Sequence, residues 1–245
     1  MAPAVSVITP CFNAAGTLSR TVASVRAQDF ADWEMIISDD GSADDSLAVA
    51  DRLAAADPRI RVLRWSGPNS GAARARNRAL AVSRGRYIAF LDADDEWLPE
   101  KLSRQIGFMR AENVAFSFTG FFREKDGVQR QVEVPPSVDH DALLRGCVIG
   151  CLTAVYDSAV FGRVPMPELW FRQDYGTWLT LLKQTDRARA VQMPLAIHHV
   201  RAGSLSSNRL RASVGTWRMY RQVAGLSRYR ATVCLASHLW RRLWN

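Results

Sequence analysis

Residues 85–95 read Gly-Arg-Tyr-Ile-Ala-Phe-Leu-Asp-Ala-Asp-Asp, an apolar run that ends in three carboxylates. The run from Tyr87 to Leu91 predicts a buried strand. Two carboxylates separated by one residue at the end of a buried strand are costly unless a cation is present. Their oxygens suit Mg²⁺ or Mn²⁺, which commonly also hold substrate phosphates. The alternative is a solvated loop in which Asp94 or Asp95 caps the following helix.

The residues before this stretch alternate short apolar runs with helix-like segments. Strands are expected over residues 5–9, 33–38, 60–65 and 86–91, and helices over 17–28, 44–56 and 72–83. Such an alternation predicts βαβ units and a parallel sheet. Ligands of such sheets bind at the carboxyl ends of the strands.

The pattern is looser after residue 95. We expect helices over 98–111 and 174–183, a short helix from 141, and a helical segment from 208. Strands are expected over 114–118 and 195–199, with an edge strand over 127–134 and a buried strand over 150–156.

Two further acidic groups stand at expected element ends. Asp39 and Asp40 follow the second strand and precede Gly41 and Ser42. A carboxylate there can accept hydrogen bonds from a nucleobase or ribose, although an Asp-Gly turn alone would also explain the pair. Asp174 stands at the start of a helix, where a lone Asp is commonly an N-cap.

The chain has 245 residues, of which 48% are hydrophobic and 23% charged, as in ordinary globular proteins. The four cysteines are expected to be reduced thiols. We expect no signal peptide and no bilayer-spanning segment. The net charge is +8, and no Asp or Glu follows Asp186, whereas eleven arginines do. This cationic end should seek phosphates of lipid, nucleotide or nucleic acid.

Taken in order, the acidic turns resemble those of family 2 glycosyltransferases with the GT-A fold. The resemblance runs from about residue 5 to 220, and the residues that carry it are Val5–Asn13, Trp33–Ser42, Ala73–Asn77 and Gly85–Asp95. Later stretches are similar to the members that make bacterial surface polysaccharides, the teichuronic acid biosynthesis glycosyltransferases among them. These stretches are Ala115–Thr119, Ile149–Thr153, Arg172–Asp174 and Ser204–Asn208.

The resemblance implies an α/β GT-A fold, a Rossmann-like and mostly parallel central sheet flanked by helices, with a C-terminal helical tail. The expected domain covers residues 1–207, with a nucleotide-sugar-binding half over 1–95 and an acceptor half over 96–207. Residues 208–245 would form a basic amphipathic tail.

The resemblance also implies roles for residues of the first half. Asp92 and Asp94 would bind Mn²⁺ or Mg²⁺, and either Asp39 or Asp40 would bind the base, usually uracil, with Asp40 favoured. The expected contacts to the nucleotide-sugar are Thr9, Pro10, Asn13, Asp39, Asp40, Arg74, Arg76, Asp92 and Ala93. For Arg74 and Arg76, contact with the diphosphate and a place on a helix surface are equally open.

In the second half, Asp174 would be the general base, with Gln173 where the family commonly has Glu. It would take the proton of an acceptor hydroxyl as that oxygen attacks the anomeric carbon, which inverts the stereochemistry. His198 and His199 could be ligands, although a structural role is favoured. Trp170 and Phe171 are weaker candidates for acceptor contacts.

These implications favour an inverting, metal-dependent hexosyltransferase that uses a nucleotide-sugar, with a UDP-sugar expected. The acceptor would be a glycan or lipid-linked glycan. Alternatives are a nucleotidyltransferase of related fold, which usually has a Gly-rich loop absent here, and a basic nucleic-acid-binding protein, for which no usual motif is present. We expect no nucleic acid partner, and the oligomeric state stays open.

Apolar residues recur at three- and four-residue steps near the C-terminus: Leu226, Tyr229, Val233, Ala236, Trp240 and Leu243. On a helix they form one stripe with arginines beside or opposite it. Such a helix can lie on an anionic membrane surface, which would place the protein in the cytoplasm or peripherally on the inner membrane. Packing on the catalytic domain or on a second subunit is the alternative.

Overall fold

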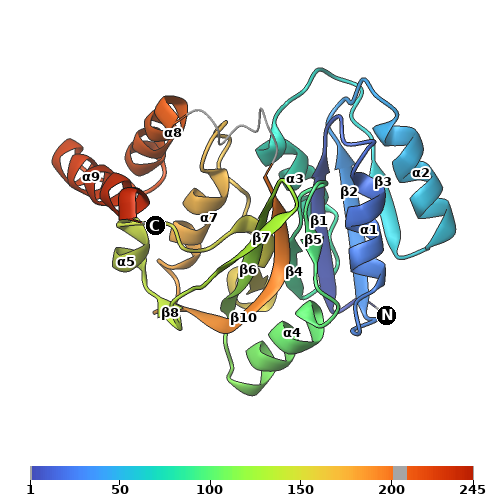
Figure 1. Cartoon of the computed structure of the whole chain (residues 1–245), viewed down its shortest axis with the longest axis horizontal. Helices are drawn as coiled ribbons and strands as arrows, with labels where there is room; N and C mark the ends of the chain where they lie inside the picture. The colour runs from blue at the N-terminus through green and yellow to red at the C-terminus, as the bar shows by residue number, and fades with distance from the viewer. Residues whose placement is uncertain (1, 201–208, 245) are drawn as a thin grey trace.

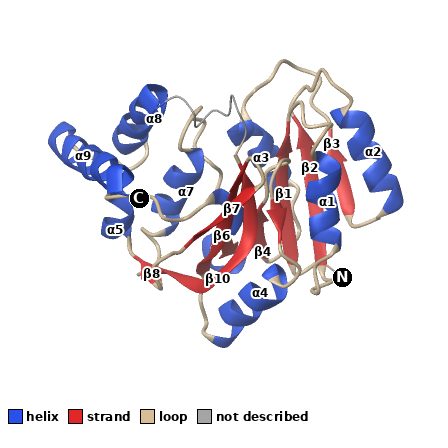
Figure 2. Cartoon of the chain, in the orientation of Figure 1, coloured by secondary structure: helices blue, strands red, loops and turns tan. Residues whose placement is uncertain are grey.

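A ten-stranded sheet runs through the computed structural model, which describes residues 2–200 and 209–244 (Figures 1 and 2). The strand order is β3-β2-β1-β4-β9-β6-β10-β5, with β7 on β6 and β8 on β10. Helices cover both faces of this sheet (Figure 2). The expected α/β fold with a helix-flanked central sheet is confirmed.

The N-terminal half holds the parallel part of the sheet, because β1 pairs in parallel with β2 and β4, and β2 with β3. The strands are β1 (Val5–Cys11), β2 (Trp33–Asp39), β3 (Ile60–Leu63) and β4 (Tyr87–Phe90). The connecting helices are α1 (Leu18–Arg26), α2 (Ser46–Ala56) and α3 (Ala72–Ala81). Each strand of these βαβ units falls where the apolar pattern predicts it.

The C-terminal half is mixed, since β9 runs antiparallel to both β4 and β6, whereas β6 and β10 are parallel. Its strands are β5 (Glu96–Trp97), β6 (Phe116–Lys125), β7 (Val128–Val132), β8 (Ser137–Val138), β9 (Val155–Asp157) and β10 (Ala188–His199). Its helices are α4 (Lys101–Ala111), α5 (His140–Leu144), the 3₁₀ helix η1 (Cys151–Thr153), α6 (Ser158–Phe161), α7 (Gln173–Leu181), α8 (Arg209–Gln222) and α9 (Arg228–Trp244).

Two hydrophobic cores lie on opposite faces of the sheet because side chains alternate along each strand. Ile8, Ile36 and Phe90 belong to the core that includes residues of α3, α5, α7 and α8. Val7 and Met35 belong to the core that includes residues of α1, α2 and α4. The central strands are therefore buried on both faces, as parallel strands usually are.

One sequence expectation in the second half was wrong, and another strand was correctly placed but too short. Residues 150–156 are not one buried strand, since η1 precedes the three-residue β9. The strand expected over 195–199 is in fact the twelve-residue β10. Its pairing with β6 shifts register on both sides of Pro194, and these irregularities hide the alternation that would identify a long strand.

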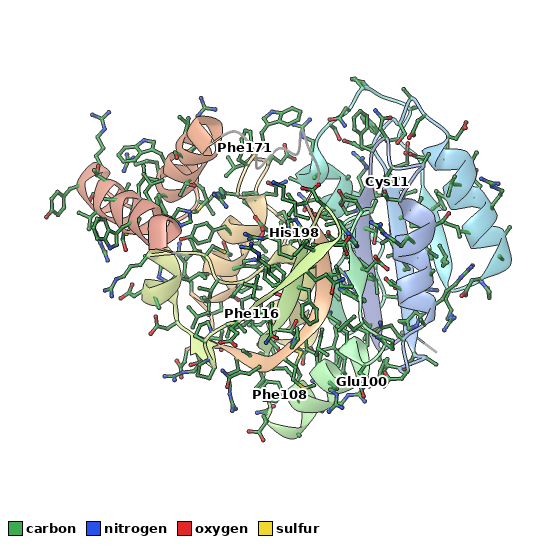
Figure 3. The ribbon with its side chains drawn as sticks, in the orientation of Figure 1. Cys11, Glu100, Phe108, Phe116, Phe171 and His198 are labelled. Atoms are coloured by element: carbon green, nitrogen blue, oxygen red, sulfur yellow. The ribbon has the colours of Figure 1, made fainter. Side chains whose placement is uncertain are left out.

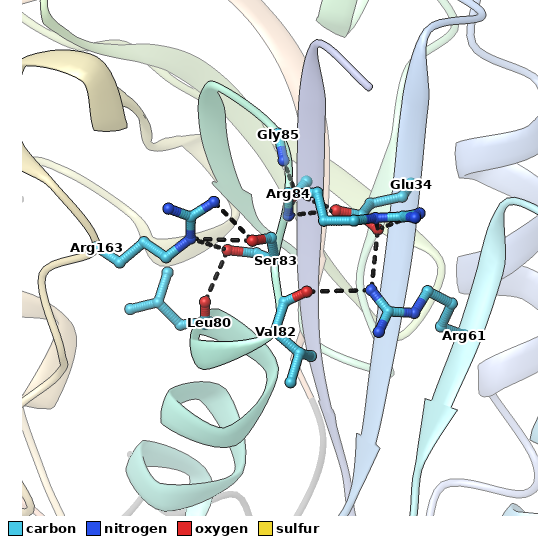
Figure 4. Close-up of polar contacts among 9 residues, drawn as sticks. Glu34, Arg61, Leu80, Val82, Ser83, Arg84, Gly85 and Arg163 are labelled. Atoms are coloured by element: carbon cyan, nitrogen blue, oxygen red, sulfur yellow. Dashed lines mark hydrogen bonds and ion pairs between the residues drawn. The ribbon is translucent and has the colours of Figure 1, made fainter. Parts of the chain in front are cut away.

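A buried carboxylate stabilises the amino-terminal end of the parallel strands (Figure 4). Glu34 is 1% exposed and accepts hydrogen bonds from Ser6 Oγ at 2.7 Å and Arg84 N at 2.6 Å. It also pairs with the guanidinium groups of Arg84 and Arg61. Burial alone would raise the pKa of Glu34, but these hydrogen bonds outweigh burial and lower it. The turn between α3 and β4 is thereby tied to β1 and β2.

The C-terminal helices share the hydrophobic core that includes α3, α5 and α7. Met219 and Tyr220 of α8 and Ala231 of α9 are fully buried in the cluster that includes α7. The hydroxyl of Tyr220 donates to Leu144 O at 2.6 Å and lies 3.0 Å from the hydroxyl of Tyr175 on α7. The helical segment expected after residue 208 is thus two helices, of which α8 is an integral part of the fold.

Within the described residues, no helix is both long and apolar enough to span a bilayer. The boundary expected between 207 and 208 falls outside the described residues, as do Arg201 and the stretch Ser204–Asn208.

Lys101 is fully buried at the start of α4, and its Nζ has no hydrogen-bond partner. Nζ lies 3.8 Å from the centre of the Trp97 ring. Burial lowers the pKa of this amine well below the ordinary lysine value of 10.5. The amine is therefore an unsatisfied polar group in an apolar site, which costs about 1–3 kcal/mol.

We expect Lys101→Met to raise the free energy of unfolding by about 1–3 kcal/mol, which is roughly 2–4 °C in Tm for each kcal/mol. Because the folded-state pKa is below the unfolded one, unfolding takes up protons at pH values between the two, and there the stability of the parent rises with pH. The gain should therefore be largest near pH 7 and shrink toward pH 10.5. Thermal melts of both proteins across this range would check it. A variant less stable than the parent at pH 7 would contradict the prediction.

Candidate active site

Three expected site segments meet at the carboxyl ends of the parallel strands. Cys11, the last residue of β1, lies opposite Asp39 in the register, and its carbonyl accepts from Asp40 N at 2.8 Å. The backbone N of Leu91 donates to Ile8 O on the other side of β1. Cys11 marks this edge near the top of Figure 3. The turns that carry Asp39, Asp40 and Asp92 are therefore neighbours, as the sequence predicts.

Asp39 stabilises its own turn. Its Oδ2 accepts from Gly41 N and Ser42 N at 3.1 and 3.2 Å, and its Oδ1 accepts from Ser42 Oγ at 2.6 Å. Gly41 has a φ of +76°, and a Cβ there would lie 2.5 Å from Gly67 O. The turn thus needs glycine and lies directly against the 67–71 loop.

Asp40 is 2% exposed and bonded to that loop. Its carboxylate accepts from Ser70 N at 2.9 Å and from Gly71 N at 2.7 Å. It also pairs with Arg78 at 2.5 Å. The side chain favoured for binding the base is therefore engaged within the protein, where it orders the loop that borders the site.

Other residues expected at the nucleotide differ in how far they are exposed. Asn13, with φ of 48°, is exposed and bonds through Oδ1 to Ala43 N at 2.9 Å. Pro10 is partly exposed, whereas Thr9 is fully buried and its Oγ1 lacks a hydrogen-bond partner. Asn13 and Pro10 are thus placed to meet a ligand at this edge.

Exposed aromatic side chains border the same loop. Trp65 is 40% exposed and donates from Nε1 to Pro68 O at 2.9 Å. The Arg78 guanidinium lies 4.9 Å from the centre of the Trp65 ring. Trp170, which is 62% exposed, lies against Gly71, since a Cβ there would be 3.5 Å from its ring. Such rings offer stacking faces to a base or a sugar.

The carboxylates after β4 form a crowded cluster. The Asp92 side chain is about one-third exposed and pairs with the buried Arg76 at 2.5 Å. Asp95 is 4% exposed and accepts from His199 N at 3.0 Å. Burial first, and then the charges of Asp92 and Asp94, raise the pKa of Asp95 well above its ordinary value. Ala93 is buried between these acids.

The charge of Asp174 on α7 acts on the same buried arginine that pairs with Asp92. Asp174 lies in the first turn of α7, after Arg172 in a left-handed conformation with φ of 65°. Burial lowers the pKa of Arg76, but the carboxylates of Asp92 and Asp174 help to raise it above its ordinary value. The expected metal-binding turn and the expected base therefore act on the same buried guanidinium.

The arginines of α3 have roles that the sequence left open or missed. Arg74 is exposed and pairs with Glu168 at 2.8 Å, so it lies on the helix surface in this state. Arg76 is buried and holds Asp92 instead of facing solvent. Arg78, absent from the expected site, pairs with Asp40. Two features could have identified Arg78. It lies four residues after the candidate Arg74, on the same face of the helix, and the buried Asp40 had no other expected positive partner.

The two histidines of β10 differ in their surroundings. His199 Nε2 lies 2.7 Å from Glu96 Oε1, and its Nδ1 lies 3.5 Å from Glu124 Oε1. Burial first, and then Arg123, lower the pKa of His198, whose ring lies edge-on to Phe121. His198 lies near the middle of the molecule (Figure 3). His199 thus organises acids beside Asp95, which agrees with the structural role that the sequence favoured.

Phe171, the other aromatic considered for the acceptor, packs on α8. A Cβ at Gly215 would lie 2.6 Å from Phe171 Cβ (Figure 3). Of the pair, Trp170 is the one that presents an exposed ring.

The cysteines are unpaired thiols, as the sequence predicts. All four are free thiols, and burial raises the pKa of Cys11 and of Cys147 to about 12.

No group of three or more His, Cys, Asp or Glu side chains in the described part of the chain is arranged to hold a metal ion by itself. The donor set still fits a divalent cation that shares its shell with a diphosphate, because Mg²⁺ is commonly held by one or two carboxylates plus substrate phosphates. Three carboxylates, those of Asp92, Asp94 and Asp95, lie within four residues of this turn, and the charges of Asp92 and Asp94 help to raise the pKa of Asp95. Asp92 and Asp94 are the residues that would hold the ion.

The family model for glycosyl transferase family 2 matches residues 6–164, which include nearly all of β1, the acidic turns after β2 and β4, and β9. The chain belongs to glycosyl transferase family 2. The protein is therefore a glycosyltransferase, which decides among the three functions that the sequence left open.

Curated members of family 2 match almost the whole chain. The putative teichuronic acid biosynthesis glycosyltransferase TuaG of Bacillus subtilis is 41% identical over 96% of this chain and 94% of its own. The UDP-Glc:alpha-D-GlcNAc-diphosphoundecaprenol beta-1,3-glucosyltransferase WfaP of Escherichia coli is 34% identical over 94% and 90%. The resemblance seen in the later stretches of this family 2 glycosyltransferase is thus confirmed.

Solved structures confirm the GT-A fold of this family 2 enzyme. The TarS fragment 1–349 of S. aureus in complex with UDP-GlcNAc superposes with a TM-score of 0.77 over 98% of this chain and 72% of that chain. The two sequences are 19% identical, so the likeness concerns the fold alone.

Proposed function

We propose that the enzyme transfers a sugar from a UDP-sugar to a hydroxyl of a lipid-linked glycan, with inversion and with Mg²⁺ or Mn²⁺, in bacterial surface polysaccharide synthesis. The observation that carries the proposal is the ion pair between Asp92 and the buried guanidinium of Arg76, on which the negative charge of Asp174 also acts. A group that would hold the donor diphosphate and a group that would deprotonate the acceptor thus border one site. The donor and acceptor classes follow the name of the E. coli relative.

In this reaction Asp174 accepts the proton of the acceptor hydroxyl. The oxygen attacks the anomeric carbon, and the bond between that carbon and the diphosphate oxygen breaks, so that UDP leaves with the electron pair. A metal ion held by Asp92 and Asp94 would supply charge neutralisation for the diphosphate. Asp40, Ser70 and Arg78 keep the 67–71 loop ordered, and Trp65 and Trp170 offer faces for the base and sugar.

The donor class is tested by thermal shift with UDP-glucose, UDP-GlcNAc, GDP-mannose and a dTDP-sugar, each with and without Mn²⁺. Binding to the folded state alone raises stability by about 2.7 kcal/mol when the ligand is at 100 times its Kd. We expect a shift with the UDP-sugars that requires Mn²⁺ or Mg²⁺. A shift confined to another nucleotide would overturn the donor assignment.

The stereochemistry of sugar transfer follows from the proposal of one general base, Asp174. Asp174 is the one candidate base, in the first turn of α7, and its charge acts on Arg76. We therefore expect a single displacement, in which an α-linked donor gives a β-linked product. NMR of the first-formed glycoside would decide, and retention of the donor configuration would rule out this mechanism.

A further inference from the structure

Helix α9 has two chemically different faces. One face packs on the protein, where Ala231 is fully buried and His238 is 5% exposed. Cys234 and Leu235 pack against the same core. The ring of His238 stacks on Tyr175 of α7, with 6.1 Å between the ring centres. The orientation of α9 about its own axis is therefore fixed by the fold.

The opposite face is apolar and exposed. Tyr229 is 79% exposed, Val233 51% and Trp240 63%, and Ala236 between them is exposed as well. At about 100° per residue these four side chains fall within an arc of about 60°. We call these four residues the α9 outer face. Leu226, expected in the same stripe, is buried and precedes α9, and the side chain of Leu243 lies outside the described residues.

Positive charge flanks the α9 outer face on both sides. Arg228 and Arg230 are exposed and project about 100° to either side of it. No Asp or Glu occurs anywhere after Asp186, so α9 offers no acid to compensate them. Tyr and Trp with arginines beside them are typical of helices that lie in the interface of a membrane.

We propose that the α9 outer face docks on the surface of an anionic lipid bilayer. The rings would enter the headgroup region, and Arg228 and Arg230 would reach lipid phosphates from the sides. Contact of this face with a second copy of the chain would bring the same arginines together without a carboxylate on either α9. Charge therefore favours the bilayer over a dimer as the occupant.

The position of α9 agrees with the proposed acceptor, and this consequence rests on the proposed function. Figure 1 places α8 and α9 together at one end of the molecule, beyond α7. Contacts join α9 to α8 and α8 to α7, whose first turn carries Asp174. An enzyme docked through α9 would thus hold the base side of its site near lipid-linked glycans.

The test is co-sedimentation of the whole chain with phosphatidylcholine vesicles that contain or lack phosphatidylglycerol. The variant Tyr229→Ser/Val233→Ser/Trp240→Ser should bind anionic vesicles at least roughly tenfold more weakly than the parent. Arg228→Gln and Arg230→Gln should each weaken binding about fivefold, and added salt should weaken that of the parent. Val128→Ser/Val160→Ser is the matched control, since these valines are 58% and 57% exposed on β7 and α6.

The inference is overturned if the parent does not bind, or if the triple variant binds like the parent. It is also overturned if light scattering shows a dimer that the triple variant dissociates, which would assign the face to a second copy. Circular dichroism of each variant confirms that it is folded. The vesicle experiment contains no sugar donor, so its outcome does not depend on sugar transfer. A failure of membrane docking can therefore be distinguished from a failure of the proposed function.

Discussion

Replacing Asp174 with Asn should lower kcat for sugar transfer about 10²–10⁴-fold, the usual loss when a general base is removed. Asn keeps the shape of the side chain and its place in the first turn of α7 but cannot accept the acceptor proton. The affinity for the donor should stay within a few-fold of the parent, because the expected donor contacts lie in the first half of the chain, on β1, β2, α3 and the turns beside them.

Initial rates at saturating donor and acceptor, together with donor binding by calorimetry, would check this result. Asp186→Asn is the matched control, because Asp186 is an exposed acid beyond the other end of α7. Parent-like turnover by Asp174→Asn would show that another group is the base. Loss of donor binding along with activity would instead indicate a structural role at the start of the helix.

Asp94→Ala should have the second large effect. Metal ions supply several kcal/mol of charge stabilisation to such reactions, so we expect about a 10³-fold loss of transfer and the loss of metal-dependent donor binding. The surrounding turn should persist, because Arg20 Nη2 and Thr21 Oγ1 bond to the backbone carbonyls of residues 94 and 95, which this substitution retains.

Transfer with and without EDTA, and the Mn²⁺ dependence of the UDP-sugar thermal shift, would measure this effect. Asp45→Ala serves as control, because Asp45 is an exposed acid after β2 whose side chain makes no capping hydrogen bond. Full activity of the parent in excess EDTA would show that the acidic turn works without a metal ion.

The placement of the acidic turns could be predicted from the sequence because it depends on local pattern. Short apolar runs predicted β1, β2 and β4, and parallel pairing then required the turns after them to share one edge. The positions of Asp39 and Asp92 at this edge could be predicted from these two steps alone. The roles of individual residues in ligand binding remain predictions.

The internal partners of the acids could not be predicted, because they come from distant parts of the chain. Asp40 is bonded to Ser70, Gly71 and Arg78, between thirty and thirty-eight residues away. Arg76 was a candidate for the diphosphate, and its burial against Asp92 depends on packing with Met166. The sequence motifs identify which acids belong to the site, but the residues that contact these acids are determined by the tertiary fold.

The second half was harder to predict for a different reason. Its apolar runs are short, and periodicity alone cannot separate a buried strand from a buried helical turn. The run over 150–156 contains one of each, η1 and β9. In β10, Pro194 and the shifts of register around it interrupt the alternation of side chains.

The contact between the hydroxyls of Tyr175 and Tyr220 limits where the chain can be truncated without disrupting the fold. The family model ends at residue 164, before both tyrosines. A fragment cut at that limit would lose α7 with Asp174, and one cut before α8 would leave the hydroxyl of Tyr175 and the carbonyl of Leu144 without Tyr220. The segment matched by the family model is therefore shorter than the folded unit, and expression fragments or chimaeras should retain the chain at least through Leu226.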